Sequence, residues 1–256
     1  MTLPDAGGPP LGPGVSEDAL LGGRVRLRQP VDGARVSIDP VFLAASVPVE
    51  PGQLVLDIGC GTGAAMLCLA AREPQCRVTG LERQRDLVRI AGDNIILNGM
   101  ASRASVMVGD LLNPPPRISA GAFDHVIANP PYLNRERANE TANPARAEAT
   151  IEGDAELGDW VRFALTMAKP NGTVTLIHRA DRIDAVLGQI AGRAGEVVVF
   201  PLWPGVGKPA SRIIVRARKQ VGSPARLAVG MVLHEADGRF SQAAEAVLRG
   251  ADALAI

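Results

Sequence analysis

The chain has 256 residues, of which 46% are hydrophobic, and its 27 basic and 27 acidic residues give a formal net charge of zero. A chain of this size can form a stable hydrophobic core without disulfide bonds. Its three cysteines, an odd number, fit neither a disulfide framework nor a zinc site. Because it shows no signal-peptide pattern and no run of about 18 apolar residues, we expect a cytoplasmic protein without a membrane span.

Composition along the chain predicts a tail followed by one domain. Residues 1–18 are rich in Pro, Gly and acidic residues, which favours a flexible tail. The domain over 19–256 is predicted to comprise a leading segment at 19–50, a catalytic core at 51–220 and a C-terminal extension at 221–256. Within the leading segment, Asp39 and the apolar run Val41–Ala45 predict a short helix that covers a ligand.

A glycine-rich turn follows the first apolar run of the core. Leu54–Ile58 reads as a buried strand, Gly59, Gly61 and Gly63 form the turn, and Ala64–Ala71 reads as a helix. Glycines let the backbone approach a ligand, and the start of a helix offers unpaired N–H groups. The turn lacks the Lys-Ser/Thr pair of a phosphate loop and the glycine spacing of the dinucleotide fingerprint. It therefore favours a ligand that carries a carboxylate over a triphosphate.

Two further predicted strands each run into an acid. Arg77–Leu81 ends at Glu82, and Ala104–Val108 ends just before Asp110. Glu82 lies 21 residues after Gly61, about the separation at which doubly wound folds hold a ribose diol. Polar groups at strand ends are Asp57, Glu82, Asp110 and Asn129. A lone acid there is usually a turn or cap residue, but four such groups predict a ligand crevice at one sheet edge.

The stretch Asn129-Pro130-Pro131-Tyr132 carries the most specific chemistry. It follows Phe123–Ala128, which reads as a strand, and the prolines end that strand and hold Asn129 extended. The Asn129 carboxamide oxygen and the adjacent carbonyl could accept both hydrogens of a planar amine, while Tyr132 stacks on its ring. An ordinary Asn-Pro turn is the alternative interpretation.

The remaining elements complete an alternating α/β pattern. The polar stretch 134–152 is predicted to be either a lid or a solvated loop. Helices are predicted over Asp154–Ala168, Asp181–Ala191 and after Ser241, a turn over Lys169–Gly172, and strands over Thr173–Ile177, Glu196–Leu202 and Arg212–Ala217.

Together these residues resemble the class I S-adenosylmethionine-dependent methyltransferases that carry an Asn-Pro-Pro-Tyr motif. The resemblance covers about 30 to 220 and implies an α/β, Rossmann-like fold, with a seven-stranded, mostly parallel sheet, an antiparallel last strand and helices on both faces. Five segments resemble the bacterial tRNA(Val) adenine-N6-methyltransferase family: Gly22–Pro30, Asp32–Arg35, Ile38–Ala45, Asp93–Gly99 and Lys208–Val215.

The resemblance also implies a role for each site residue. The catalytic residues would be Asn129, Pro130, Pro131 and Tyr132. The cofactor, S-adenosyl-L-methionine, would be held by Asp57, Gly59, Cys60, Gly61, Gly63, Glu82, Arg83, Asp110, Leu111 and Asn129. Asp57 would lie near its ammonium group, Glu82 at its ribose, and Asp110 with Leu111 at its adenine. Cys60 needs only to be small.

The implied reaction is N6-methylation of an unpaired adenine in RNA, with a tRNA near its anticodon as the expected partner. No metal and no obligate protein partner are implied. Protein glutamine N5-methyltransferases and ribosomal RNA guanine-N2 methyltransferases remain alternatives. The former carry a helical domain ahead of the catalytic one, whereas only about 50 residues precede the glycine turn in this chain. A third alternative is a non-catalytic protein that binds the cofactor and associates with RNA. Arginines early in the chain, Arg135, Arg137 and Arg146 in the polar stretch, and basic residues late in the chain could form a basic face.

Overall fold

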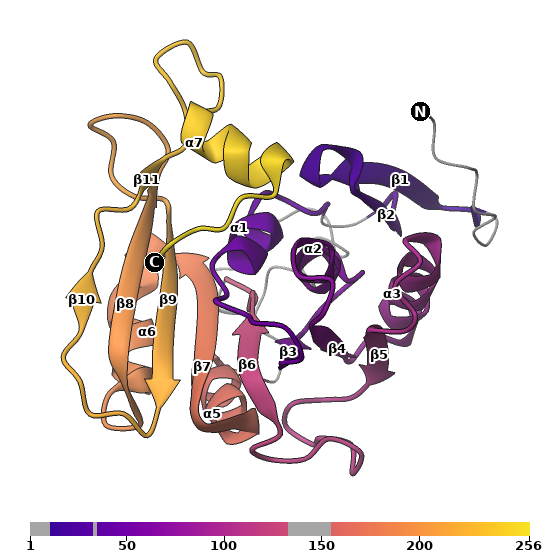
Figure 1. Ribbon diagram of the computed structural model, residues 1–256, viewed down its shortest axis with the longest axis horizontal. Coiled ribbons are helices and arrows are strands. Elements are labelled where there is room, and N and C mark those ends of the chain that lie inside the picture. Colours follow the sequence, from indigo (N-terminus) through magenta and orange to yellow (C-terminus); the bar gives the residue numbers. More distant parts are fainter. Residues whose placement is uncertain (1–10, 33–34, 133–154) are drawn as a thin grey trace.

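The fold is a twisted, mostly parallel sheet with helices on both faces, seen in a computed structural model that describes residues 11–32, 35–132 and 155–256 (Figure 1). The order of its long strands is β5-β4-β3-β6-β7-β9-β8, and β9 is antiparallel to both neighbours. The strands are β3 (Leu54–Ile58), β4 (Arg77–Glu82), β5 (Ala104–Val108), β6 (Phe123–Ala128), β7 (Ala168–Arg179), β8 (Ala194–Trp203) and β9 (Arg212–Lys219).

This sheet confirms the expected α/β class, with one difference in strand count. Two short strands, β10 (Arg226–Leu227) and β11 (Met231–Val232), both pair with β8 and bring the sheet to nine strands among the described residues. They add only two residues each to the edge of the sheet, around the start of the segment from Leu227 where a strand-like piece is predicted.

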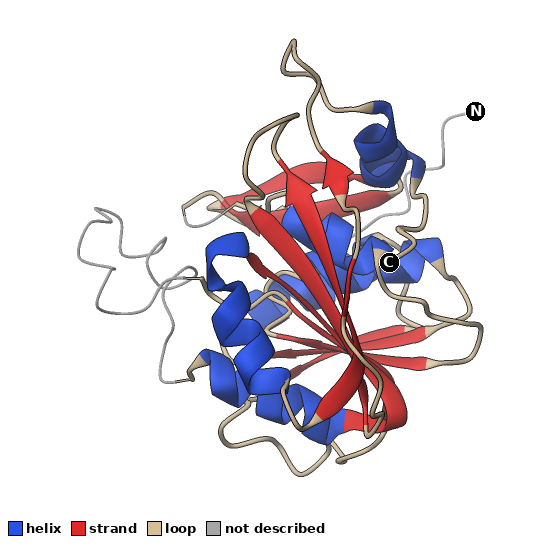
Figure 2. Ribbon diagram, turned by 90° about the vertical axis from the view of Figure 1, so that its left-hand side faces the viewer, coloured by secondary structure: helices blue, strands red, loops and turns tan. Residues whose placement is uncertain are grey.

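Helices cover the two faces of the sheet in separate sets (Figures 1 and 2). One set is α1 (Asp39–Ala45), α2 (Ala64–Arg72) and α3 (Arg85–Leu97), and the other is α5 (Leu157–Met167) and α6 (Ile183–Ile190). Each set has its own hydrophobic core: Phe42 and Met66 lie in the first, and Trp160 and Val161 in the second. Every residue of α2 from Ala64 to Ala70 is buried, which explains its nearly uniform apolar sequence.

The strand order places the ligand crevice. The chain proceeds from β3 to β4 and β5 on one side, then returns to β6 on the other side of β3. Crevices in open α/β sheets form at the carboxyl ends of strands where the order reverses in this way. The segments that follow β3 and β6 meet at this point, and they contain the glycine turn and Asn129.

The turn predicted at Lys169–Gly172 is wrong, because these residues lie within β7. Ala168 pairs with Phe123, and the next pair is Thr173 with His125, so five residues of β7 span the distance of two residues of β6. The extra residues form a bulge in which Asn171 takes a left-handed φ of 62°. The Pro-Asn-Gly sequence is thus a strand irregularity and not the end of the strand.

Residues before the core form a hairpin that the sequence did not predict. Strand β1 (Val15–Leu20) pairs antiparallel with β2 (Val25–Pro30), so the predicted tail extends too far, since it includes Val15–Asp18. Residues 1–10 lie outside the described part. The hairpin lies beside the helical segment Ala246–Gly250, which continues α7 (Gln242–Glu245) (Figure 1). The first turn of α7 is capped by the Ser241 hydroxyl, as predicted.

The C-terminal segment packs on α1. The Leu254 amide donates to the Ala45 carbonyl at 2.8 Å, and Arg24 donates to the Arg249 carbonyl at 2.8 Å. Arg216 donates to the Ile256 carbonyl. These bonds hold α1, the hairpin and the chain end together, and α1 begins at a residue of the crevice, Asp39.

Candidate active site

The turn between β3 and α2 needs glycine for both conformation and space. Gly59 and Gly61 have left-handed φ angles of 65° and 56°, and Gly63 precedes α2 with a φ of 92°. The Gly59 amide donates to the Leu81 carbonyl at 2.7 Å, which ties the turn to β4. A Cβ at Gly59 would lie 2.5 Å from the Trp160 ring, so any other residue would displace that ring.

We expect Gly59→Ala to lower the free energy of unfolding by about 2–5 kcal/mol. About 1–2 kcal/mol comes from a left-handed alanine and about 1–3 kcal/mol from overpacking against Trp160. Gly61→Ala is the matched control, because a Cβ there meets nothing within 4 Å and only the conformational cost applies. Urea unfolding without ligand measures both, and equal losses would contradict the packing argument.

Two buried acids lie next to the turn. Glu82 accepts hydrogen bonds from the Gly61 amide at 3.0 Å and from the Gln84 amide at 2.8 Å. Asp57 accepts from the Met66 amide at 3.1 Å. Burial raises the pKa of Asp57 to about 8; the Met66 amide opposes this rise and the charge of Glu82 adds to it. A cationic group beside Asp57 would therefore favour its charged form.

Asn129 and Tyr132 lie at the rim beyond β6. Both line the crevice, and the two prolines between them fix the backbone. The Tyr132 hydroxyl contacts two oxygens, Oδ1 of Asn129 and Oδ2 of Asp39, the latter at 2.9 Å. In this structure, therefore, the oxygen expected to accept an amine contacts the tyrosine hydroxyl.

Three residues that the sequence did not assign to the site surround Tyr132. Arg212 Nε donates to Asp39 Oδ2 at 2.9 Å, and its Cζ lies 4.9 Å from the centre of the Tyr132 ring. The His178 ring meets the Tyr132 ring edge-on, with centroids 5.2 Å apart. Asp39 and Arg212 fall in two segments that carry the family resemblance, and His178 lies near the carboxyl end of β7. These locations, in the resembling segments and near a strand end, were the sequence signals that could have identified the three residues.

Asp39, Tyr132 and Arg212 line one cleft of about 470 Å³. Predicted residues that line it are Asp57, Gly59, Cys60, Gly61, Asn129 and Tyr132. Predicted residues that do not line it are Gly63, Glu82, Arg83, Asp110, Leu111, Pro130 and Pro131. The cleft thus joins the glycine turn to the amide and phenol of the Asn-Pro-Pro-Tyr stretch.

Comparison with known sequences gives one family model and a set of relatives. The model described as "Methyltransferase small domain" matches residues 34–151. The tRNA1(Val) (adenine(37)-N6)-methyltransferase of Aeromonas hydrophila is 28% identical over 209 residues, 81% of this chain and 85% of the relative. The protein of the same name from Yersinia pestis is 28% identical over 218 residues, 81% of this chain and 82% of the relative.

Solved structures share the fold. The crystal structure of a "predicted O-methyltransferase" from Agrobacterium tumefaciens has a TM-score of 0.72 at 24% identity, covering 85% of this chain and 99% of the other. The tRNA (m1A58) methyltransferase of Aquifex aeolicus has a TM-score of 0.54 at 12% identity, covering 75% and 72%. The chain is a methyltransferase enzyme that uses S-adenosylmethionine.

The cleft of this methyltransferase fits that cofactor. Its volume lies within the range of about 300–1,000 Å³ that small-molecule sites occupy. Asp57 offers an acid to an ammonium group, and the glycine turn brings its backbone close beside it without side chains at Gly59 and Gly61. Thr62 also lines the cleft, and its hydroxyl is a buried polar atom with no hydrogen-bond partner among the described residues. Such an atom is suited to a bound polar ligand.

Asp110 and Cys60 make few contacts that suggest chemistry. Asp110 follows β5 and accepts from the Leu112 amide at 2.9 Å, a local turn bond. Cys60 packs against Gly80, where a Cβ would lie 2.5 Å from its sulfur. Burial, with the charges of Asp57 and Glu82, raises the pKa of Cys60 well above that of a free thiol. The thiol therefore stays protonated, in line with the expectation that this residue needs only to be small.

Two asparagines, Asn94 in α3 and Asn98 at its C-terminal end, hydrogen-bond to the backbone of the hairpin. Asn94, which is fully buried, accepts from the Arg28 amide at 2.8 Å and donates to the carbonyls of Arg28 and Thr62, both at 2.9 Å. Asn98, one turn later, makes the same pair of bonds to Arg26 at 2.8 and 2.7 Å. The Asn94 side chain thus links β2 directly to Thr62 in the glycine turn.

We expect Asn94→Ala to lower the free energy of unfolding by at least about 2 kcal/mol, because it removes three buried hydrogen bonds. Asn98→Ala is the matched control: it removes similar bonds at a more exposed position, where water replaces them at smaller cost. Chemical denaturation of both variants measures the difference. A larger loss for Asn98→Ala would contradict the role of Asn94 as the buried anchor.

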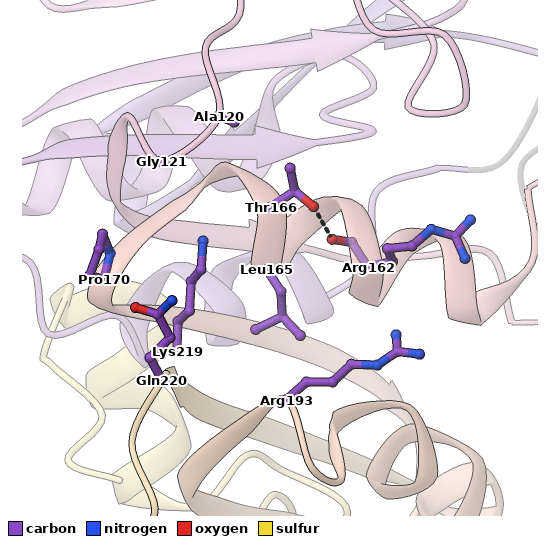
Figure 3. Close-up of a pocket in the computed structure, with 9 residues that line it drawn as sticks. All are labelled: Ala120, Gly121, Arg162, Leu165, Thr166, Pro170, Arg193, Lys219 and Gln220. Carbon is purple, nitrogen blue, oxygen red and sulfur yellow. Dashed lines mark hydrogen bonds between the residues drawn. The ribbon is translucent and has the colours of Figure 1, made fainter.

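A second cavity, of about 730 Å³, lies at the opposite edge of the sheet (Figure 3). Gly121 precedes β6, Pro170 lies at the start of β7 and Lys219 ends the antiparallel β9, so all three mark the amino ends of the parallel strands. Arg162 and Arg193 also border it. None of the predicted site residues line this cavity, so we do not place the reaction there.

His125 lies deep in the sheet. Its ring bonds to Thr173 at 2.7 Å and to Gln53 at 2.8 Å, and burial lowers its pKa to about 4. A neutral histidine with both nitrogens bonded has a structural role. The described residues contain no group of three or more His, Cys, Asp or Glu that could hold a metal ion. Within the same residues, every helix is too short or too polar to cross a bilayer.

Proposed function

We propose that this methyltransferase methylates the N6 amine of an unpaired adenine in RNA, with a tRNA as substrate and the base near the anticodon. The observation that carries the proposal is that Asn129 and Tyr132 share a cleft with the glycine turn. The relatives named tRNA1(Val) (adenine(37)-N6)-methyltransferase, which match 81% of this chain, support the choice of base and RNA. A tRNA substrate and the free cysteines favour a cytoplasmic location.

On the target side, Asn129 would bind the amine. Its carboxamide oxygen and the adjacent backbone carbonyl would accept the two N–H groups, which draws the nitrogen lone pair away from the ring. Pro130 and Pro131 fix the direction of that oxygen. The Tyr132 ring would stack on the base, a contact worth about 1–3 kcal/mol.

On the cofactor side, the predicted assignments stand as proposals. When bound, S-adenosylmethionine supplies a methyl group made electrophilic by the sulfonium. Asp57 would face the ammonium group, where a cation would lower its raised pKa. Glu82 would bind the ribose hydroxyls with its carboxylate, and Asp110 with the Leu111 backbone would bind the adenine.

The work of the protein in this reaction is positioning. Holding the amine nitrogen in line with the methyl group can supply about 7–11 kcal/mol of the barrier. Acceptors on the two N–H groups also stabilise the positive charge that grows on nitrogen, as Asn129 would. No residue needs to form a covalent bond with the substrate.

The charges of the described surface constrain how RNA binds. Of the early arginines, Arg26 and Arg28 pair with Glu17, and Arg35 pairs with Asp18. These pairs reduce the basic face expected from the sequence, whose members Arg135, Arg137 and Arg146 lie outside the described residues. Binding would then depend more on the stacked base, which suits an unpaired loop nucleotide because its extrusion costs less than that of a paired one.

The test incubates purified protein with labelled S-adenosylmethionine and, separately, total tRNA, total ribosomal RNA and a release factor. Digestion of each product should yield labelled N6-methyladenosine from tRNA. Labelled N2-methylguanosine from ribosomal RNA, or N5-methylglutamine from the release factor, would replace the proposal with that alternative. No label in any product, with cofactor bound, would favour the non-catalytic RNA-associated protein.

A further inference from the structure

The Tyr132 hydroxyl faces two acceptors with one proton. It contacts Asn129 Oδ1 and lies 2.9 Å from Asp39 Oδ2. A phenol can donate a single hydrogen bond at a time, and both of these oxygens are acceptors. The proton can therefore point to one of them, and moving it to the other needs only rotation about the C–O bond.

The ring that carries this hydroxyl is held from two sides. Arg212 lies over one face, 4.9 Å from its centre, and His178 meets it edge-on at 5.2 Å. Asp39 is only 4% exposed, and Arg212 Nε fixes its carboxylate at 2.9 Å. The four residues come from four separate elements: α1, the segment after β6, β7 and β9. The packing leaves the hydroxyl proton as the part that is free to change partner.

This arrangement conflicts with binding of the target amine at the proposed site. The amine of the target base needs Asn129 Oδ1, which the Tyr132 hydroxyl contacts in this structure. When the base enters, the hydroxyl must release that oxygen and find another acceptor, because a buried hydroxyl without a partner is costly, by about 1–3 kcal/mol. Asp39 is already within hydrogen-bond distance.

We propose that Asp39 is a positioning residue that takes over the Tyr132 hydroxyl when the target amine binds Asn129. The inference rests on the proposed function, since it assigns the displaced oxygen to an amine. Arg212 supports Asp39 by holding its carboxylate in place. Tyr132 then serves the reaction twice: its hydroxyl occupies Asn129 before the base arrives, and its ring remains in place to stack on the base afterwards.

The exchange requires a phenol that keeps its proton. Burial raises the pKa of Tyr132 above its ordinary value, the charge of Asp39 and the hydrogen bond to it raise it further, and Arg212 opposes them. The titratable and charged groups that face the ring are Asp39 from α1, His178 from β7 and Arg212 from β9.

The first arm of the test needs no RNA. Tyr132 is the only tyrosine of the chain, so the ultraviolet absorbance of tyrosinate reports it alone. Asp39→Asn should ionise Tyr132 at a lower pH than wild type does, with circular dichroism used to confirm folding at each pH. Asp32→Asn, a change at another acid that lines the same cleft, should leave the titration unchanged. Identical titrations of Asp39→Asn and wild type would overturn the proposal.

The second arm measures methyl transfer to RNA in a double-mutant cycle. Asp39→Ala should lower kcat/KM by about tenfold or more, because the hydroxyl then stays on Asn129 and competes with the amine. Adding Tyr132→Phe removes that competitor, so the double variant should fall within about twofold of Tyr132→Phe alone. Asp39→Leu, which is similar in size and also lacks an acceptor oxygen, serves as the second variant if Asp39→Ala fails to fold.

The outcomes separate the two proposals. If Asp39→Ala lowers kcat/KM equally in the wild-type and Tyr132→Phe proteins, Asp39 does not act through the hydroxyl and the inference fails while the proposed function stands. If wild type methylates no RNA, the proposed function fails and the inference with it, whereas the titration still decides whether Asp39 contacts Tyr132.

Discussion

Asn129→Ala should lower kcat by about 100- to 1,000-fold, the usual effect of removing one group that stabilises charge in a transition state. The affinity for S-adenosylmethionine should change by less than about twofold, because the side chain is expected to act on the target amine. Single-turnover transfer to tRNA measures the first quantity, and calorimetric titration of the cofactor measures the second.

Asn113→Ala is the matched control for this experiment. It removes the same side chain from an exposed position after β5, which does not line the cleft. Its rate and cofactor affinity should equal those of wild type. An Asn129→Ala variant with an unchanged rate would contradict the assignment of the carboxamide to the amine, whatever the identity of the RNA.

Glu82→Ala should have the opposite profile and weaken the binding of S-adenosylmethionine by about 10- to 100-fold. The carboxylate holds the Gly61 and Gln84 amides, at 3.0 and 2.8 Å, and is proposed to bind the ribose. Hydrogen bonds to a charged group contribute about 1.5–3 kcal/mol, and about 1.4 kcal/mol corresponds to a tenfold change in affinity. Cofactor titration measures the effect without RNA.

Two controls sharpen this prediction. Glu50→Ala changes an exposed glutamate away from the cleft and should leave the affinity unchanged. Glu82→Gln keeps an acceptor oxygen but removes the charge, so the pKa of Asp57 should fall from about 8, because Glu82 is one cause of its rise. A cofactor affinity in Glu82→Ala equal to that of wild type would show that the turn is held without this carboxylate.

Most of the sheet could be predicted because its strands are short apolar runs that are followed by glycines or prolines. Leu54–Ile58 is buried on both faces and runs into glycines, and Phe123–Ala128 runs into two prolines. Parallel strands covered by helices on both sides need such sequences. The residues at their carboxyl ends, Asp57 and Asn129, do line one cleft.

The rest depends on contacts between residues far apart in the sequence. The bond between Asp39 and Arg212 joins positions 173 residues apart, and no local pattern encodes that pairing. The β1–β2 hairpin is held on α3 by the side chains of Asn94 and Asn98, which have no apolar period to reveal it. A Pro-Asn-Gly sequence reads as a turn whether it ends a strand or, as after Lys169, forms a bulge inside one.

The central claim is that the Asn129 carboxamide binds the target amine opposite the methyl donor. A crystal structure with S-adenosylhomocysteine and an adenine-containing oligonucleotide from the methylated tRNA tests it most directly. We predict a distance of about 2.7–3.2 Å between Asn129 Oδ1 and the adenine N6 nitrogen, with the Tyr132 hydroxyl on Asp39. An adenine bound in the cleft with Asn129 Oδ1 still held by the Tyr132 hydroxyl would contradict the claim.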